Sequence, residues 1–347
     1  MIKKAERMLK NFYLEMIGPI RPMQIIYTIF QFLRYPYPKN VTFEVTNSCN
    51  LKCAMCPQPY MRRNKGFMDF NFYKKIIGQI ENKVKEVSLY STGEPFLHPK
   101  LCDMIKYAKL KGIPHVQTST NATLLNERNA KLLLSSGLDF LQISIEGENK
   151  EKYEKIRKGA NFEKVRENLK NLILLRNKNK KPTIDIHLLL YEDTNPRKFV
   201  EIWGDYCDRM HVSSMNPIRL FNKDKGTMGF IKPKDVELYE LSSKSIGCLQ
   251  PFHTIAISYD GKVGLCCGDF DFDLVMGDTK KERLIDIYNN KLYKQIRRKF
   301  LFKNFDDTPC KGCPSLYRIK DEKLVYKTQV LVNKLMKSKK ANNGIHK

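Results

Sequence analysis

Three cysteines within eight residues constrain this chain more than any other feature of its sequence. Cys49, Cys53 and Cys56 follow a run, Val41 to Thr46, in which apolar and polar residues alternate. Such alternation, rich in β-branched residues, is typical of a strand, and Asn47-Ser48 then predicts a loop. The sequence therefore predicts three thiolates on one loop at the end of a strand.

The spacing Cys-x-x-x-Cys-x-x-Cys supplies three ligands, one fewer than the irons of a 4Fe-4S cluster. A cluster held in this way keeps one iron open to another ligand, whereas a cluster that only transfers electrons usually has all four irons closed by cysteine. The alternatives are a zinc loop and buried free thiols. The motif is one ligand short for structural zinc and too dense for chance core cysteines. We therefore predict a 4Fe-4S cluster that binds a further ligand.

This motif after a strand resembles the radical S-adenosylmethionine (SAM) superfamily. In that family the amino and carboxylate groups of SAM chelate the open iron, and the reduced cluster cleaves SAM to a 5′-deoxyadenosyl radical that abstracts hydrogen from a substrate. One position departs from the family pattern, because Met55 precedes the third cysteine where an aromatic residue is common. Met55 is still apolar and polarizable enough to pack beside an adenine. The resemblance implies SAM, a SAM-binding 4Fe-4S cluster and a reducing partner such as ferredoxin or flavodoxin.

The composition is that of a globular protein in a reducing compartment. The chain has 347 residues, of which 42% are hydrophobic, enough for one barrel and a smaller module. Ten cysteines would suggest disulfides in a secreted protein, but residues 1–21 lack the compact apolar stretch of a signal peptide. No run of about 18 or more uncharged apolar residues predicts a transmembrane helix. We therefore expect a cytoplasmic protein.

The formal net charge is +25, from 62 Lys and Arg against 37 Asp and Glu. This charge suits a nucleic acid, an anionic membrane surface or a phosphorylated substrate, and does not choose among them. Because the lysines are spread over nearly every predicted helix, a solvated basic surface is favoured. Residues 1–39 are interpreted as a basic amphipathic extension that covers the bottom of the barrel or makes a peripheral membrane contact.

From residue 40 onward, strand-like runs alternate with helical stretches. Six such units predict an α/β fold in which helices cover a parallel sheet. Six units rather than eight give the partial (β/α)6 TIM-like barrel that the radical SAM resemblance implies, with its active site at the carboxyl ends of the strands. Strands are expected at 41–46, 84–90, 115–118, 140–145, 183–190 and 210–215, and helices at 72–81, 100–111, 127–135, 163–176 and 196–206.

The second predicted strand ends in Ser91-Thr92-Gly93-Glu94-Pro95. Gly allows close backbone approach, and a carboxylate can accept hydrogen bonds from an ammonium group. The stretch resembles the Gly-Gly-Glu motif of radical SAM enzymes, with Thr92 in place of the first glycine. The resemblance implies that Gly93 and Glu94 hold the methionyl amino group of SAM. Taken alone, Gly-Glu-Pro would be only a turn.

Two further stretches resemble segments of the same family. Thr118-Ser119-Thr120-Asn121 ends the third strand, and Ile143 to Gly147 ends the fourth, with Arg157 downstream. The resemblance implies that Asn121, Ser144 and Arg157 contact SAM. Ala122 replaces a family glycine and Glu146 a family aspartate. The alternatives are that Asn121 caps the following helix and that Arg157 is a surface charge.

A second group of cysteines lies near the C-terminus. Cys248, Cys266, Cys310 and Cys313 could close either a structural zinc site or a second 4Fe-4S cluster. The pattern Cys-x12-Gly-x4-Cys followed by Cys-x-x-Cys resembles the shortened, Twitch-type auxiliary-cluster domain of SPASM radical SAM proteins, as in the 2-deoxy-scyllo-inosamine dehydrogenase type. The resemblance implies one auxiliary 4Fe-4S cluster with four cysteine ligands. The adjacent Cys267 is an alternative ligand to Cys266, but Cys266 has the family spacing from Gly261.

The remaining polar and sulfur residues carry weaker expectations. Cys102 and Cys207 fall within predicted helices and are interpreted as buried hydrophobic residues. His187, Tyr191 and Arg219 lie near predicted strand ends, where each is a polar contact for the substrate or a structural residue.

The C-terminal part is expected to differ from the barrel. Asp260-Gly261 predicts a hairpin between 252–259 and 262–267, and a helix is expected at 282–299. After Cys313 a basic helix or tail is expected, frayed from Lys337 onward. The expected divisions are an extension at 1–39, the barrel at 40–245, a small α+β auxiliary-cluster domain at 246–330 and a basic tail at 331–347.

These features predict a radical SAM enzyme that oxidises a sugar, cyclitol or nucleotide-linked alcohol, with the auxiliary cluster as electron acceptor. The first alternative is maturation of a ribosomally made peptide, although residues 1–39 are too short for the usual winged-helix recognition segment. The second is nucleic-acid modification, motivated by the charge. A non-enzymatic electron carrier would not account for Gly93-Glu94 or for the open iron. The substrate itself follows no general motif.

Overall fold

The computed structural model describes most of the chain from residue 36 onward. The expected N-terminal extension lies outside the described residues as far as residue 35, and so does Cys313. None of the helices in the described part is long and apolar enough to cross a membrane. The described residues are 36–176, 181–191, 193–214, 218–222, 227–231, 241–245, 248, 250–301, 304, 310, 317–319 and 322–344.

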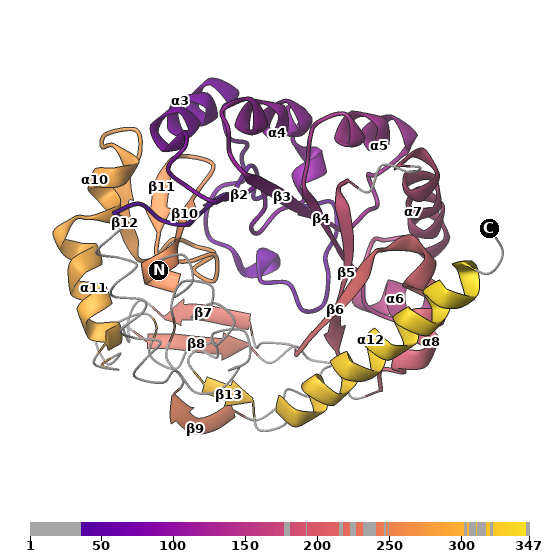
Figure 1. The fold of residues 1–347 in the computed structure, drawn as a ribbon. Coiled ribbons are helices and arrows are strands. Elements are labelled where there is room, and N and C mark those ends of the chain that lie inside the picture. The colour runs from indigo at the N-terminus through magenta and orange to yellow at the C-terminus, as the bar shows by residue number, and fades with distance from the viewer. Residues whose placement is uncertain are drawn as a thin grey trace, which may run out of the picture.

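A curved nine-stranded sheet in the order β12-β11-β10-β1-β2-β3-β4-β5-β6 forms the centre of the molecule, and helices surround it (Figure 1). Strands β1 to β6 pair in parallel, each with the next along the chain. The predicted α/β partial barrel is therefore confirmed. The six strands are Asn40–Phe43, Glu86–Ser88, His115–Thr120, Phe140–Ser144, Thr183–Leu190 and Arg209–Ser214.

Alternation along the strands separates an apolar outer face from a polar inner face. Phe43 of β1 is fully buried, and its ring contacts Tyr73 of the covering helix α3, with ring centroids 5.0 Å apart. The neighbouring Thr42 pairs in register with Ser88, which pairs with Gln117. The Gln117 amide donates a hydrogen bond to Ser88 Oγ at 2.9 Å. The interior of the barrel is therefore lined by hydrogen-bonding groups.

The five helices expected between the strands are present with small shifts of their ends. One helix, α6, was not expected, and the last predicted helix of the barrel continues into a short 3-10 turn, η3 (Gly204–Tyr206). Cys207 follows that turn rather than lying within a helix, and it is buried as expected, whereas Cys102 in α4 is only half-buried. The helices are α3 (Phe70–Ile80), α4 (Leu101–Leu110), α5 (Glu127–Leu134), α6 (Lys150–Ile156), α7 (Phe162–Arg176) and α8 (Pro196–Trp203).

The C-terminal strands extend the same sheet. β10 (Thr254–Ile257) pairs in parallel with β1, and the expected hairpin joins it to β11 (Lys262–Gly264), which pairs with β12 (Val275–Asp278). Gly261 has φ of +94° in the connecting turn, a conformation that favours glycine. The module that carries the second group of cysteines is thus hydrogen-bonded directly to the strand that precedes the first group.

The other C-terminal elements differ from the predicted pattern. The helix expected at 282–299 is two helices, α10 (Leu284–Tyr288) and α11 (Lys291–Leu301), because Asn289 and Asn290 between them bond to nearby carbonyl groups. A short helix, α9 (Gln250–His253), precedes β10. Two small antiparallel pairs were not expected: β7 (Ile218–Asn222) with β8 (Thr227–Ile231), and β9 (Leu241–Ser245) with β13 (Tyr317–Ile319).

The last helix, α12 (Glu322–Gly344), lies along β6 and α8 (Figure 1). The frayed tail expected from Lys337 is wrong as far as Gly344, because the helix passes residue 331 without a break. Gln329 of α12 pairs with the edge of β6: its Oε1 accepts from Val212 N at 2.7 Å and its Nε2 donates to Met210 O at 3.0 Å. One side chain thus takes the place of a neighbouring strand.

Replacing Gln329 with Ala should lower the free energy of unfolding by about 1 to 3 kcal/mol, because two backbone groups at the edge of β6 lose their partners. Urea unfolding of the purified protein measures this difference. Lys327→Ala removes an exposed long side chain from the same helix and is the control, with an expected change within about 0.5 kcal/mol. Equal effects of the two changes would contradict the role of Gln329.

Candidate active site

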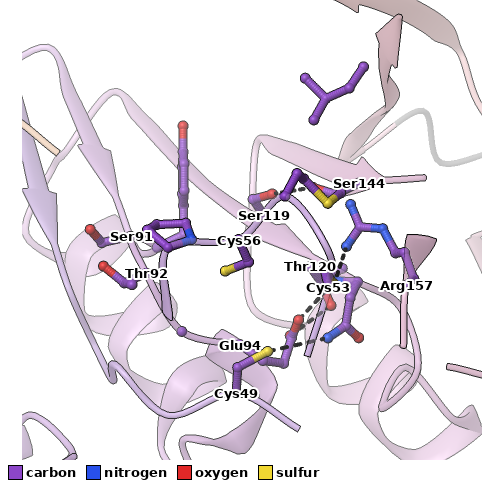
Figure 2. Close-up of a pocket in the computed structure, with 16 residues that line it drawn as sticks. Cys49, Cys53, Cys56, Ser91, Thr92, Glu94, Ser119, Thr120, Ser144 and Arg157 are labelled. Carbon is purple, nitrogen blue, oxygen red and sulfur yellow. Dashed lines mark hydrogen bonds between the residues drawn. The ribbon is translucent and has the colours of Figure 1, made fainter. Parts of the chain in front are cut away.

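The three cysteines of the first group line one cavity of about 370 Å³ at the carboxyl ends of the barrel strands (Figure 2). Among the described residues, no three Cys, His, Asp or Glu side chains converge on a point where they could hold a single metal ion. The three thiols lie along the wall of the cavity instead. The same wall contains all five residues predicted to contact SAM: Gly93, Glu94, Asn121, Ser144 and Arg157.

Each of these three sulfur atoms accepts a hydrogen bond from an N–H group. The backbone N–H two residues after Cys49 lies 3.4 Å from Cys49 Sγ, and the corresponding group after Cys56 lies 3.5 Å from Cys56 Sγ. The guanidinium of Arg157 donates to Cys53 Sγ at 3.8 Å. Such hydrogen bonds stabilise thiolates and tune the potential of a ligated cluster. The donor set therefore fits a cysteine-held iron–sulfur cluster.

Burial raises the pKa of all three thiols, and that of Cys53 to about 12. The cause is that a thiolate loses its hydration in the cavity wall. At neutral pH the thiols therefore keep their protons until a metal offsets the negative charge, and iron binding must release those protons.

The loop that carries the cysteines is held by the segment after α6. Backbone N–H groups of residues 52 and 54 donate to the carbonyl oxygens of residues 158 and 156, each at 2.9 Å. This pairing places Arg157 beside Cys53, and its Nε donates to Glu146. Because Arg157 is only 7% exposed, the alternative that it is a surface charge is wrong.

Glu94 joins the ends of two strands as well as facing the cavity. Its carboxylate accepts hydrogen bonds from Thr120 Oγ1 at 2.7 Å, Asn121 N at 2.8 Å and Phe96 N at 3.1 Å. Burial raises the pKa of Glu94, against the effect of these three donors. A carboxylate has about four acceptor positions, so one remains for a ligand.

Gly93 is required by contact with the chain just before the cysteines. A Cβ atom at this position would lie 2.4 Å from Thr46 O and 2.5 Å from Ser48 O. Glu94 N donates to the same Ser48 carbonyl at 2.8 Å. The close backbone approach predicted at Gly93 is therefore made to Thr46 and Ser48, just before the cysteines.

Asn121 does not cap the following helix, so that alternative is wrong. Asn126 caps α5. Asn121 Oδ1 instead accepts from Thr123 N at 2.9 Å, and its Nδ2 donates to Asn50 Oδ1 at 3.1 Å. These bonds tie the end of β3 to the cysteine loop. They also hold Ala122 at φ of +61°, a left-handed conformation that explains why glycine is common there.

Ser144 lies at the end of β4, with its Oγ 3.4 Å from Ser119 Oγ. Tyr90, Thr120 and Leu189 are among the residues of the wall that had no predicted role. Their one signal in the sequence is their place at the end of a strand. Glu146 was noted only as a departure from the family pattern, and the structure shows it paired with Arg157.

The other polar candidates lie outside the cavity wall. His187 is aligned with Ser144 on the neighbouring strand, but its Nε2 is bonded to Ser213 Oγ at 2.6 Å and its ring stacks on His211. Tyr191 is buried against Ile156. The side chain of Arg219 is outside the described part of the chain.

The second group of cysteines is described in part. Cys248, Cys266 and Cys310 are half-buried, and Cys313 is outside the described residues. Cys248 is followed by α9, which contacts α11: Arg297 Nε donates to Pro251 O at 2.8 Å. Cys248 thus belongs to the module around α9 and α11.

Cys266 and its neighbour Cys267 differ in burial, because Cys266 is half-buried and Cys267 is exposed. Burial raises the pKa of Tyr293 in α11, and the nearby Cys266 adds to the effect. Burial also raises the pKa of Tyr90 to about 12, and here Cys267 contributes. Cys266 thus acts on a tyrosine of α11, and Cys267 on a tyrosine of the first cavity. This placement favours Cys266 as the ligand.

Family models match both regions. Residues 43–201 match the radical SAM superfamily, and residues 248–314 match SPASM, an iron–sulfur cluster-binding domain. The chain therefore contains a radical SAM domain and a SPASM iron–sulfur cluster-binding domain. SAM and 4Fe-4S clusters are the cofactors that this pair of domains uses.

Among proteins of known name, the chain is 25% identical over 318 residues to the tungsten-containing aldehyde ferredoxin oxidoreductase cofactor-modifying protein of Pyrococcus furiosus. That match covers 79% of this chain and 87% of the relative. A GTP 3′,8-cyclase of Chlorobaculum tepidum is 30% identical over 134 residues. This second match covers only 38% of the chain and 40% of the cyclase, less than half of each.

Solved structures share the fold at low sequence identity. Streptococcus suis SuiB bound to S-adenosylmethionine has a TM-score of 0.60 at 14% identity, covering 86% of this chain and 78% of SuiB. BtrN in complex with AdoMet and 2-DOIA has a TM-score of 0.51 at 19% identity, covering 81% of this chain and 91% of BtrN.

Gly93→Ala should displace the cysteine loop, because the new methyl group would overlap two carbonyl oxygens. We expect reconstituted protein to lose most of the iron of the first site, measured per chain against unmodified protein. Gly78→Ala is the matched control, because a Cβ there meets nothing within 4 Å inside α3. That change should leave iron unaltered and stabilise the helix by about 0.5 to 1 kcal/mol. Full iron content in Gly93→Ala would contradict the role of the contact.

Cys266→Ser and Cys267→Ser should differ in iron content. Cys266→Ser should remove most of the iron of the second site, whereas Cys267→Ser should leave it in place, because Cys267 is exposed. Iron analysis and the visible absorption of the two reconstituted variants make the comparison. Loss of iron from Cys267→Ser alone would reverse the assignment.

Proposed function

We propose that this chain is a radical SAM oxidoreductase that oxidises an alcohol group of a sugar, cyclitol or nucleotide-linked substrate. Cys49, Cys53 and Cys56 hold the SAM-binding 4Fe-4S cluster in this proposal, and Cys248, Cys266, Cys310 and Cys313 hold an auxiliary one. The observation that carries the proposal is the single cavity in which three thiols and the five predicted SAM contacts meet.

The residues of the cavity wall have complementary tasks in binding SAM. Glu94 has one acceptor position left for the methionyl ammonium group. Arg157 uses Nε on Glu146 and one N–H on Cys53, and its remaining N–H groups can donate to a carboxylate. Ser144 supplies a hydroxyl for the ribose, and Asn121 lines the wall beside it with its amide bonded to Asn50 and Thr123. When bound and reduced, the cluster supplies the electron that cleaves SAM.

The inner faces of the barrel strands carry polar groups beyond the cavity wall, which supports a substrate rich in hydroxyl groups. Besides Ser88 and Gln117, the inner faces of β5 and β6 contribute His187 and Ser213, which bond to each other. Burial lowers the pKa of His187 to about 4, so the ring is neutral at pH 7 and can donate and accept. The fold likeness to BtrN, solved with 2-DOIA, points in the same direction.

Maturation of a peptide or protein is the second candidate. A structure of SuiB bound to the precursor peptide SuiA shares the fold, with a TM-score of 0.58. The relative from Pyrococcus furiosus is named for modifying the cofactor of another enzyme. Either activity needs a reducing partner such as ferredoxin or flavodoxin, and we propose that the chain works in a reducing compartment, where its thiols stay available for iron.

Anaerobically reconstituted protein should hold about eight irons, and the variant with alanine at positions 49, 53 and 56 about four. Alanine at 310 and 313 should leave about four irons and SAM cleavage to 5′-deoxyadenosine under strong reductant, because the first site stays intact. Circular dichroism checks that each variant is folded.

Zinc in place of iron at the second site would refute the auxiliary cluster. If added aminocyclitols raise the rate of SAM cleavage by the protein above its basal rate, and short peptides do not, alcohol oxidation is supported. The opposite result would favour maturation.

A further inference from the structure

The segment after the first cysteines, residues 61–67, bridges two parts of the molecule; we call it the bridging segment. On one side it is bonded to the residues just before Cys49. Thr46 Oγ1 donates to Gly66 O at 2.7 Å, and Asn47 Oδ1 accepts from Gly66 N at 2.9 Å. Asn47 Nδ2 also donates to Asn64 O at 2.8 Å. The bridging segment is therefore fixed to the cysteine loop.

On its other side the bridging segment holds the turn that follows Cys266 and Cys267. Arg62 Nε donates to Asp271 at 3.0 Å and its Nη2 to Asp273 at 2.5 Å, while Arg62 N donates to Asp271 at 2.9 Å. The Asp271 and Asp273 side chains are 6% and 5% exposed, and that of Arg62 is 46% exposed. Two buried carboxylates thus bind one arginine from another part of the chain.

Arg63 connects both sides at once. Its two terminal nitrogens donate to the two oxygens of Glu44 at 2.8 and 2.6 Å, and Nη2 also donates to Phe270 O at 2.7 Å. The guanidinium lies 4.7 Å from the centre of the Phe272 ring. Glu44 is 1% exposed and stands in the chain shortly before Cys49, and Phe270 follows Cys266 by four residues.

We infer that Arg62 and Arg63 are positioning residues that fix the turn after Cys266 against the loop of Cys49, Cys53 and Cys56, and so set the separation of the two cluster sites. The inference rests on the proposed function, because it takes these cysteines as cluster ligands. It goes further in naming the contact that relates the two sites.

The chemistry of the turn explains why arginine is needed. Asp269, Asp271 and Asp273 lie within five residues, and burial together with the two neighbouring carboxylates raises the pKa of Asp269. Removing Arg62 takes a cation away from Asp271 and Asp273, beside a third carboxylate, which destabilises the turn. Arginine donates to several acceptors in fixed directions, whereas lysine supplies a point charge. Lys at position 62 should therefore restore the turn in part.

The test replaces Arg62 with Glu in the cluster-loaded protein and measures amide hydrogen exchange. We expect exchange at least about tenfold faster in residues 268–275 and in the loop around Cys49, with the outer barrel strands unchanged. Arg62→Lys should recover part of the protection. The control is Arg283→Glu, since Arg283 forms an exposed ion pair with Asp286 in the same module and contacts neither loop.

The second measurement is the magnetic interaction between the two reduced clusters, seen by electron paramagnetic resonance. We expect Arg62→Glu to weaken or broaden this interaction, and Arg283→Glu to leave it unchanged. A variant that only loses stability would keep the interaction in its folded fraction.

Unchanged exchange in both loops and an unchanged magnetic interaction in Arg62→Glu would overturn the inference. If unmodified protein holds no second cluster, the proposed function fails separately. In that case, faster exchange in both loops would still support the contact, and faster exchange in the turn alone would refute it.

Discussion

The parallel pairing of β1 with both β2 and β10 is the constraint on which the rest of the structure depends. Because β1 lies between the barrel and the C-terminal strands, the loop at its end meets polar residues from both. The contact of Gly93 with Thr46 and Ser48 then brings the end of β2 against that loop, and the bridging segment does the same for the C-terminal turn. One strand thus relates two groups of cysteines that are far apart in the sequence.

Much of the barrel could be predicted from the sequence, because period-two strands and amphipathic helices leave regular patterns. Helix α6 was missed since its seven residues are mostly charged and give little apolar pattern. The division between α10 and α11 depends on side-chain bonds of two asparagines, which compete with helical hydrogen bonds. At both places where the predicted helices were wrong, polar or charged side chains rather than hydrophobic periodicity determine the local structure.

The candidate site shows the same division. The types of residue were predictable from motifs, and the structure brings Glu94, Asn121, Ser144 and Arg157 to one cavity. Their internal partners were not predictable, because a carboxylate such as Glu94 chooses among donors that only the folded chain places nearby. The arginines of the bridging segment lie in no motif, since their partners are more than 200 residues away for Arg62 and both near and far for Arg63.

The bonds of the Gln329 side chain to β6 bear on whether copies of this protein can associate through the edge of the sheet. A sheet that does not close keeps a terminal strand whose amide and carbonyl groups can recruit a strand from another molecule. Here α12 covers β6, and Gln329 bonds to two backbone groups of that strand. The C-terminal helix therefore opposes edge-to-edge pairing with another sheet. Removal of α12 by proteolysis or truncation would leave the residues of the barrel site in place. It would also expose the edge of β6, which could then pair with a strand of another molecule.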